Sequence, residues 1–79
     1  MENLEKRLKE RLLNGQEQEH DEGLFLEVLA LLINHPEYFK MMLSLYMASL
    51  SKEGCKDAVE MFNQFLEGKI RLEEEGYGL

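Results

Sequence analysis

The chain has few of the residues that staple a small fold. Its 79 residues include one cysteine, Cys55, so no disulfide can form within the chain. Cys55 also lacks a second cysteine or a histidine at a zinc-ligand spacing. A core at this length rarely supplies more than roughly 3–5 kcal/mol of stability. We therefore expect stability to come from unusually apolar helices, from oligomerisation or from both, and the lone thiol suits a reducing cytoplasm.

Long apolar runs are also missing. The stretch 28–33 is among the longest without a polar residue, and a membrane-spanning helix needs about 20 apolar residues. The N-terminal segment MENLEKRLKERLL alternates charged residues with leucine, which differs from the continuous apolar stretch of a signal peptide. We therefore expect no contact with membranes and a cytoplasmic location.

Positive charge is scarce, because sixteen acidic residues outnumber nine basic ones and give a net charge of −7. Proteins that bind nucleic acid neutralise its phosphates with Lys and Arg, so we expect no direct nucleic-acid binding. Much of the negative charge falls within residues 16–23, in a group that we call the acidic patch: Glu17, Glu19, Asp21 and Glu22. We expect this patch to steer the encounter with a protein that has a basic surface.

Proline and β-branched residues are few as well, with one proline and no threonine, so the chain has little material for β-sheet. Its periodic stretches have a helical period instead. They predict four helices, at about residues 2–13, 22–34, 36–51 and 53–67. Asp21 and Ser51 are suited to cap the second and fourth helices, Pro36 is suited to begin the third, and Gly15 to end the first.

The sequence thus predicts an all-α fold, a small bundle of four short helices with a three-helix core and an N-terminal helical arm. The expected segments are an N-terminal helical arm at 1–15, an acidic linker at 16–21, a helical core domain at 22–75 and a flexible tail at 76–79. The arm has a narrow leucine stripe, which predicts a light clip or half of an intermolecular helix pair. The linker has no apolar residue, so we expect it to be exposed to solvent.

The second and third helices are apolar around most of their circumference, whereas a surface helix normally has an apolar arc little more than 100° wide. The fourth helix is ordinary, and its expected inward face is Cys55, Ala58, Val59, Phe62, Phe65 and Leu66. It and the thin first helix can cover only one side of the other two. An uncovered patch of several hundred Å² is rare on monomers, so we expect a homodimer to complete the bundle.

Residues 38–47, YFKMMLSLYM, form the most apolar part of the third helix. We expect one side of this helix to face the core of the monomer, through Phe39, Leu43, Tyr46 and Leu50. The protein interface is expected on another side, at Tyr38, Met41, Met42 and Leu45. This Met- and Tyr-rich surface is typical both of a homodimer seam and of a groove for another protein, and the sequence does not separate the two.

No residue pattern indicates catalysis or a metal site. His20 lies in the acidic patch, but the spacing fits no calcium-binding loop, and Asp21 is better explained as a helix cap. His35 precedes Pro36 and is expected at a turn, and Cys55 is expected to be a small buried apolar residue. The sequence has no glycine-rich phosphate loop, nucleophile elbow or HExxH motif. We therefore expect no catalytic, metal or cofactor-binding residue, and no enzyme.

These patterns favour a small acidic adaptor, inhibitor or regulatory protein that acts as a homodimer by binding another protein through its apolar helical hairpin. Two alternatives remain. One is an acidic mimic of nucleic acid, which would occupy the basic groove of a DNA- or RNA-binding protein and lose affinity steeply in salt. The other is a purely structural subunit, which would have no stable partner beyond itself.

Overall fold

The computed structural model describes residues 2–68, and within them it contains four α-helices and no β-strand. The helices are α1 (Glu2–Leu13), α2 (Glu22–Asn34), α3 (Pro36–Ser49) and α4 (Lys52–Leu66). The all-α bundle predicted from the sequence is therefore confirmed. None of the helices in this part of the chain has the length and apolar character needed to span a bilayer. The predicted tail at 76–79, and any continuation of α4 beyond Gly68, lie outside the described residues.

Local chemistry sets the helix ends, as the sequence predicted. The Asp21 carboxylate accepts a hydrogen bond of 3.0 Å from the backbone N–H of Leu24 and caps α2. The Ser51 hydroxyl accepts one of 3.1 Å from the N–H of Gly54 and caps α4 in the same way. Gly15, which follows α1, has a φ of 119°, a backbone conformation that residues with a Cβ atom rarely adopt.

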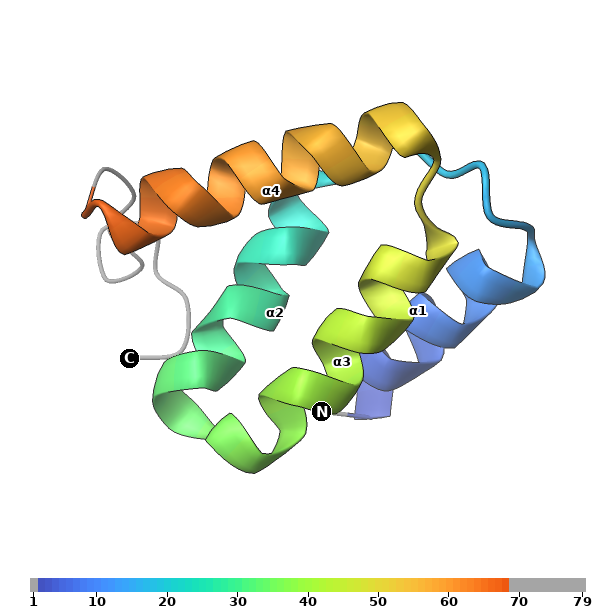
Figure 1. Ribbon diagram of the computed structural model, residues 1–79. Coiled ribbons are helices and arrows are strands. Elements are labelled where there is room, and N and C mark those ends of the chain that lie inside the picture. The colour runs from blue at the N-terminus through green and yellow to red at the C-terminus, as the bar shows by residue number, and fades with distance from the viewer. Residues whose placement is uncertain (1, 69–79) are drawn as a thin grey trace.

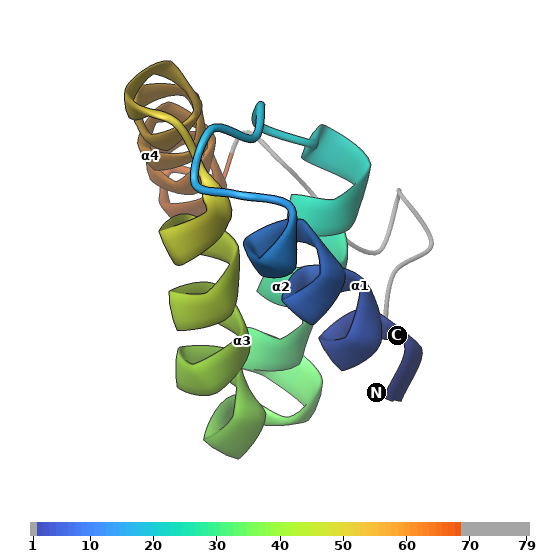
Figure 2. The ribbon, with the colours of Figure 1, turned by 90° about the vertical axis from the view of Figure 1, so that its right-hand side faces the viewer.

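The helices α2 and α3 form a hairpin around Pro36, and α1 packs against both of them (Figure 2). The fourth helix has a different orientation. It runs across the end of the hairpin that holds the start of α2 and the end of α3, at the top of Figure 1. The loop between α1 and α2 passes over this same end of the molecule (Figure 2).

The core includes residues from all four helices. Its largest fully buried side chains are Tyr46, Phe25, Leu8, Leu29, Met42, Val28 and Ser49. The first helix contributes Leu4 and Leu8 to this core, so it is an integral part of the bundle and not the light clip that its narrow stripe predicted. A narrow stripe is sufficient here because α1 packs against α2 and α3 together.

The inward face of α4 also differs from the prediction. Ala58 is fully buried and Met61 is half-buried, whereas Val59 is 50% exposed and Leu66 is 62% exposed. The reason is geometric, because α4 crosses the bundle at its end and rests on it through a narrower strip than a helix lying alongside would. Helical periodicity gives the apolar side of α4 but not the angle at which the helix crosses its neighbours.

The loop between α1 and α2 is held against the junction of α3 and α4. Gln18 accepts a hydrogen bond of 2.9 Å from the N–H of Ser51, and its own N–H donates one of 3.0 Å to the carbonyl of Ser49. Gly54 allows this close approach, because a Cβ at position 54 would lie 2.9 Å from the carbonyl oxygen of Gln18. The prediction of a solvent-exposed linker is therefore wrong for Gln18, whose backbone bonds this segment to the bundle.

We predict that Leu8→Ala lowers the free energy of unfolding by about 2–5 kcal/mol, because it leaves a cavity where a fully buried side chain was. This loss approaches the entire stability of a small domain. The matched control is Leu13→Ala in the same helix, where the side chain is 86% exposed and the loss should stay within about 0.5 kcal/mol. Urea denaturation followed by circular dichroism measures both, and equal losses would contradict the placement of α1 in the core.

Candidate functional site

The hydroxyl of Tyr46 is the centre of a polar cluster inside the bundle. The Tyr46 side chain is fully buried, and its ring stacks on that of Phe25 with 5.0 Å between centroids. Its hydroxyl accepts a hydrogen bond of 2.8 Å from the backbone N–H of Asp21. The same oxygen lies 2.5 Å from Nδ1 of His20 and 3.3 Å from the carbonyl oxygen of Asp21. Tyr46 thus fixes the end of the α1–α2 loop on α3.

His20 connects this cluster to α4. Its Nε2 lies 3.2 Å from the sulfur of Met61, and its ring meets that of Phe25 edge to face at 5.4 Å. The shorter contact of Nδ1 favours a neutral ring in which Nδ1 accepts the Tyr46 hydroxyl proton and Nε2 carries the other proton. The expectation that His20 belongs to a solvated linker is therefore wrong. No local signal reveals this role, because Tyr46 and Met61 are distant in sequence.

Burial favours the neutral forms of both groups. Desolvation lowers the pKa of His20, and Arg11 lowers it further, although Glu22, Asp57 and Asp21 oppose this effect. Burial also raises the pKa of Tyr46 to about 12, despite the opposing effects of the hydrogen bond from the Asp21 backbone and of the Arg11 charge. The cluster is therefore arranged for uncharged side chains.

The acidic patch lies on the loop that this cluster holds. Glu17, Glu19, Asp21 and Glu22 are all exposed. Arg11 of α1 lies close to them, because its guanidinium donates a hydrogen bond of 2.5 Å to the carbonyl oxygen of Glu19 and sits 5.4 Å from the centre of the Tyr46 ring. One basic side chain therefore lies beside the patch, bonded to the backbone of Glu19 and not to a carboxylate. Its role in steering a partner stays a prediction.

An open depression of about 560 Å³ lies between α2 and α4, beside His20. Its lining residues are His20, Glu22, Leu26, Asp57, Glu60, Met61 and Gln64. The carboxylates on its borders make it a negative surface, but within residues 2–68 no group of three or more His, Cys, Asp or Glu side chains could hold a metal ion. Its only ring nitrogens belong to His20, which is already bonded to Tyr46 and Met61.

The residues predicted to form an interface do not share one environment. Tyr38 is 43% exposed and Met41 is 48% exposed, so both are available to another molecule, and Leu45 is half-buried beside them on the helix. Met42 is buried, with 2% of its side chain exposed, so its assignment to the interface is wrong. It lies one turn before Tyr46 on the core side of α3. We call the exposed stripe of Tyr38, Met41 and Leu45 the α3 edge.

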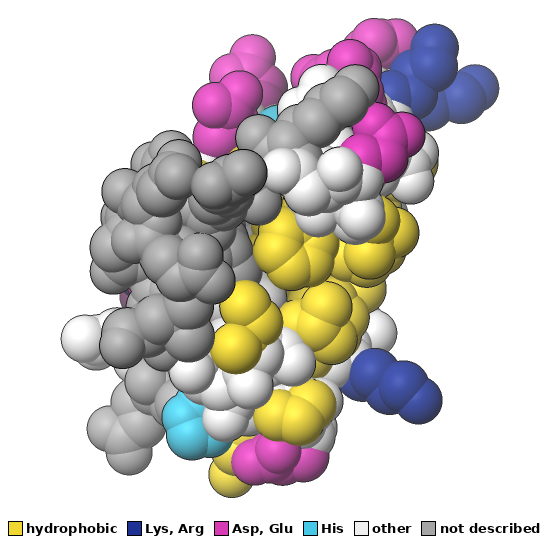
Figure 3. All heavy atoms as spheres, turned by 90° about the vertical axis from the view of Figure 1, so that its left-hand side faces the viewer, with side chains coloured by type: hydrophobic (Ala, Val, Ile, Leu, Met, Phe, Trp, Pro, Cys, Tyr) yellow, Lys and Arg dark blue, Asp and Glu magenta, His cyan; other side chains and the backbone are white. Residues whose placement is uncertain are grey.

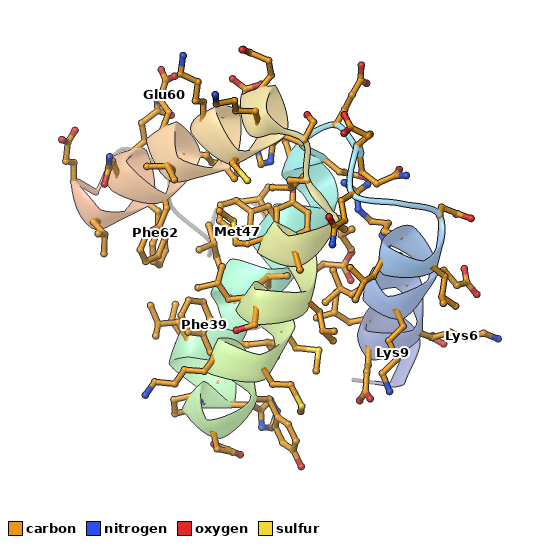
Figure 4. The ribbon with its side chains drawn as sticks, turned by 45° about the vertical axis from the view of Figure 1, so that its right-hand side comes forward. Lys6, Lys9, Phe39, Met47, Glu60 and Phe62 are labelled. Carbon is orange, nitrogen blue, oxygen red and sulfur yellow. The ribbon has the colours of Figure 1, made fainter. Side chains whose placement is uncertain are left out.

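A second apolar area lies where α4 crosses α3, and we call it the α3–α4 face: Phe39, Leu43, Met47, Phe62 and Phe65. The Phe62 ring is stacked near Phe39 at 6.4 Å and near Phe65 at 6.3 Å. In Figure 4 the side chains of Phe39 and Met47 lie on the side of α3 that faces α4, and the side chain of Phe62 on α4 points toward the same area. Hydrophobic side chains gather below α4 in Figure 3. Except for Phe39, which is buried, these side chains are half-buried.

Sequence reasoning missed the α3–α4 face as a separate surface. Leu43 was expected in the core, yet it is half-buried on the side toward α4. Cys55 was expected to be buried, and it is also half-buried, with its thiol 3.8 Å from the carbonyl oxygen of Met47. His35 lies at the turn between α2 and α3, as expected, and it is exposed.

Comparisons with known proteins add no further constraint on the site. No protein-family model matches the chain, and neither the curated proteins nor the solved structures contain a match. The functional argument therefore depends on the residues and contacts described above.

We predict that Tyr46 stays protonated above pH 10 and ionises at a pKa of about 12. Because its folded pKa is raised, its contribution to stability is present below pH 10 and is lost as the pH rises toward 12. The measurement is the ultraviolet absorbance of tyrosinate as a function of pH. The titration curve of the wild type minus that of Tyr46→Phe isolates the Tyr46 hydroxyl, and circular dichroism follows the helix content in parallel. A difference curve centred near pH 10 in the folded protein would contradict the buried hydroxyl.

We also predict that stability falls as the pH drops below the ordinary His20 value of 6.5, because its lowered pKa makes the unfolded chain bind the proton more tightly. The contribution of neutral His20 to the free energy of unfolding is fully present above pH 6.5. It is lost as the pH falls through the lowered pKa that His20 has in the folded protein. Thermal unfolding of the wild type and of His20→Gln, compared between about pH 8 and about pH 5.5, should show a smaller slope in the variant.

The matched control for this experiment is His35→Gln, which removes an exposed imidazole from a turn. His35→Gln shows what the loss of an exposed imidazole alone does to this slope, and the change caused by His20→Gln should exceed it. If His20→Gln keeps the wild-type slope instead, the interpretation of His20 as a buried neutral connector between the loop and α4 is wrong.

Proposed function

We propose that this chain is a small acidic, non-enzymatic protein that acts in the cytoplasm as a homodimer and binds another protein as an adaptor, inhibitor or regulator. The observation that supports this proposal most is the α3 edge. Tyr38 and Met41 are large apolar side chains, lie on neighbouring turns of one helix, and are nearly half exposed. Aromatic residues and methionine are enriched at protein interfaces, and monomers rarely expose such side chains together.

The geometry of the α3 edge suits pairing with a second copy. Tyr38, Met41 and Leu45 follow the spacing i, i+3 and i+7, which places them on one stripe of α3. Two copies of a straight stripe can pack against each other around a two-fold axis, because each residue then finds an equivalent apolar residue opposite it. Such a seam would complete the core on the side that α4 does not reach.

The two alternatives have less support from the contacts. A mimic of nucleic acid needs carboxylates arrayed along a surface. Here the Arg11 guanidinium lies beside the acidic patch, at the backbone of Glu19, and Arg7 pairs with Glu27 at 2.8 Å on the neighbouring helices. A purely structural subunit would leave no large apolar area outside its own seam, yet the α3–α4 face is separate from the α3 edge. Both alternatives stay predictions from the sequence.

We predict that light scattering at micromolar concentrations gives about twice the 9.3 kDa of one chain. Met41→Glu should return the protein to a monomer, because a carboxylate at the centre of the seam loses its water without gaining a partner. The control is Leu13→Glu, which puts the same charge on an exposed site of α1 and should leave the dimer intact.

The salt dependence of the dimer is a second readout. Two copies that each carry a charge of −7 repel one another, so added salt should strengthen an apolar seam and not weaken it. A wild-type mass of one chain across this concentration range, or equal effects of Met41→Glu and Leu13→Glu, would contradict the dimer at the α3 edge.

A further inference from the structure

The depression beside His20 combines apolar and negative side chains, and we call it the α2–α4 groove. Its volume of about 560 Å³ lies within the range of about 300–1,000 Å³ that is usual for binding pockets. Leu26 and Met61 supply its apolar part, and both are half-buried and pack against the core. The carboxylates of Glu22, Asp57 and Glu60 are exposed at its borders. The groove therefore offers an apolar surface and negative charge together.

Two helices form the walls of this groove. Glu22 and Leu26 are one turn apart on α2, at the spacing i and i+4. On α4 the lining residues follow the spacing i, i+3, i+4 and i+7, which places them on one side of the helix: Asp57, Glu60, Met61 and Gln64. In Figure 4 the side chain of Glu60 points away from that of Phe62. The groove and the α3–α4 face thus lie on different sides of α4.

The negative charge of the groove is not balanced within residues 2–68. None of its lining residues is Lys or Arg, and no ion pair in this part of the chain engages its carboxylates. Desolvation lowers the pKa of His20, but the charges of Glu22, Asp57 and Asp21 raise it, and among the listed charges only Arg11 acts with desolvation. The local field therefore favours a positive charge, which the half-buried His20 ring is poorly placed to carry.

We propose that the α2–α4 groove binds an arginine side chain that another protein presents. An arginine has an apolar stem, which would lie along Leu26 and Met61, and a charged head, which would stay at the open border of the groove. The planar guanidinium donates in several directions, so it can bond to Glu22 on one wall and to Asp57 or Glu60 on the other. The proposal rests on the protein-binding function proposed above and adds the place and the chemistry of the contact.

A second copy of this chain fits the groove less well. Both arginines within residues 2–68 are engaged in their own chain, Arg7 by the Glu27 carboxylate and Arg11 by the Glu19 carbonyl oxygen. Two chains with a charge of −7 also repel each other, whereas the same charge attracts a basic protein. A metal ion is a poor occupant, because no suitable group of His, Cys, Asp or Glu exists in this part of the chain.

The test uses a fluorescent peptide of about 12 residues with two arginines one helical turn apart, each next to a leucine. Three matched peptides change only the arginines. Citrulline keeps the shape without the charge and should weaken binding at least about tenfold. Lysine keeps the charge without the planar fork and should weaken it about threefold. In the third peptide, 2-amino-3-guanidinopropionic acid keeps the guanidinium on a stem two methylenes shorter and should weaken it about threefold.

Fluorescence anisotropy with the full chain measures these affinities, and amide shifts in nuclear magnetic resonance spectra locate the peptide. The largest shifts should fall within residues 20–26 and 57–64, which include the lining residues of the groove. Raising the salt from about 50 to about 500 mM should weaken the arginine peptide, because its charged contacts are near solvent.

The groove variant is Asp57→Asn with Glu60→Gln, which should weaken the arginine peptide about five- to tenfold. Both residues are exposed, so their replacement should leave the fold intact. The matched control is Glu10→Gln with Glu53→Gln, which removes the same charge from exposed positions that do not line the groove. This control should change the affinity less than about twofold.

The proposal is overturned if the arginine peptide does not bind, or if the citrulline, lysine or short-stem peptide binds as tightly as the arginine peptide. It is also overturned if the control variant weakens binding as much as the groove variant, or if the amide shifts fall outside the groove. Light scattering measures the proposed dimer separately. A dimer that does not bind the arginine peptide removes this inference alone, whereas a monomer that binds it removes only the dimer.

Discussion

The buried hydroxyl of Tyr46 is the contact on which the arrangement of the helices depends. A phenol inside a core is costly unless its oxygen is hydrogen-bonded, and here the partners come from the loop before α2, at His20 and Asp21. His20 continues the connection to Met61 on α4, and Arg11 of α1 lies over the phenol ring. Tyr46 is itself on α3. One side chain thus connects the α1–α2 loop to α3 and, through its neighbours, to α1 and α4, and the acidic patch has a defined place because this loop is held.

Local sequence chemistry accounts for much of the fold. The helix ends were predictable, since Asp21 and Ser51 cap the residues that follow them and Pro36 begins α3 at a position where its missing N–H costs nothing. What the sequence left out depends on contacts between distant residues. The burial of Met42, the contact between His20 and Tyr46, and the crossing angle of α4 arise only when helices pack, and the periodicity of one helix carries no information about that packing.

The apolar side chains predicted as one surface on α3 separate into two. The α3 edge lies on one side of the core residues of this helix, and the α3–α4 face lies on the other. A seam along the α3 edge would therefore leave the α3–α4 face uncovered. The separation also explains why residues 38–47 are rich in Met and Tyr. The core residues of α3, the α3 edge and the α3–α4 face together take up most of the circumference of the helix, so apolar residues occur around most of it.

The close contact between Gln18 and Gly54 has a consequence for the order of folding. The hairpin of α2 and α3 joins neighbouring segments, so little chain entropy is lost when it closes. The hydrogen bonds of Gln18 to Ser49 and Ser51 join distant segments, and they need the end of α3 to exist already. The α1–α2 loop is therefore expected to dock late, onto a preformed junction of α3 and α4. The segment with the densest negative charge would then be among the last to acquire its shape.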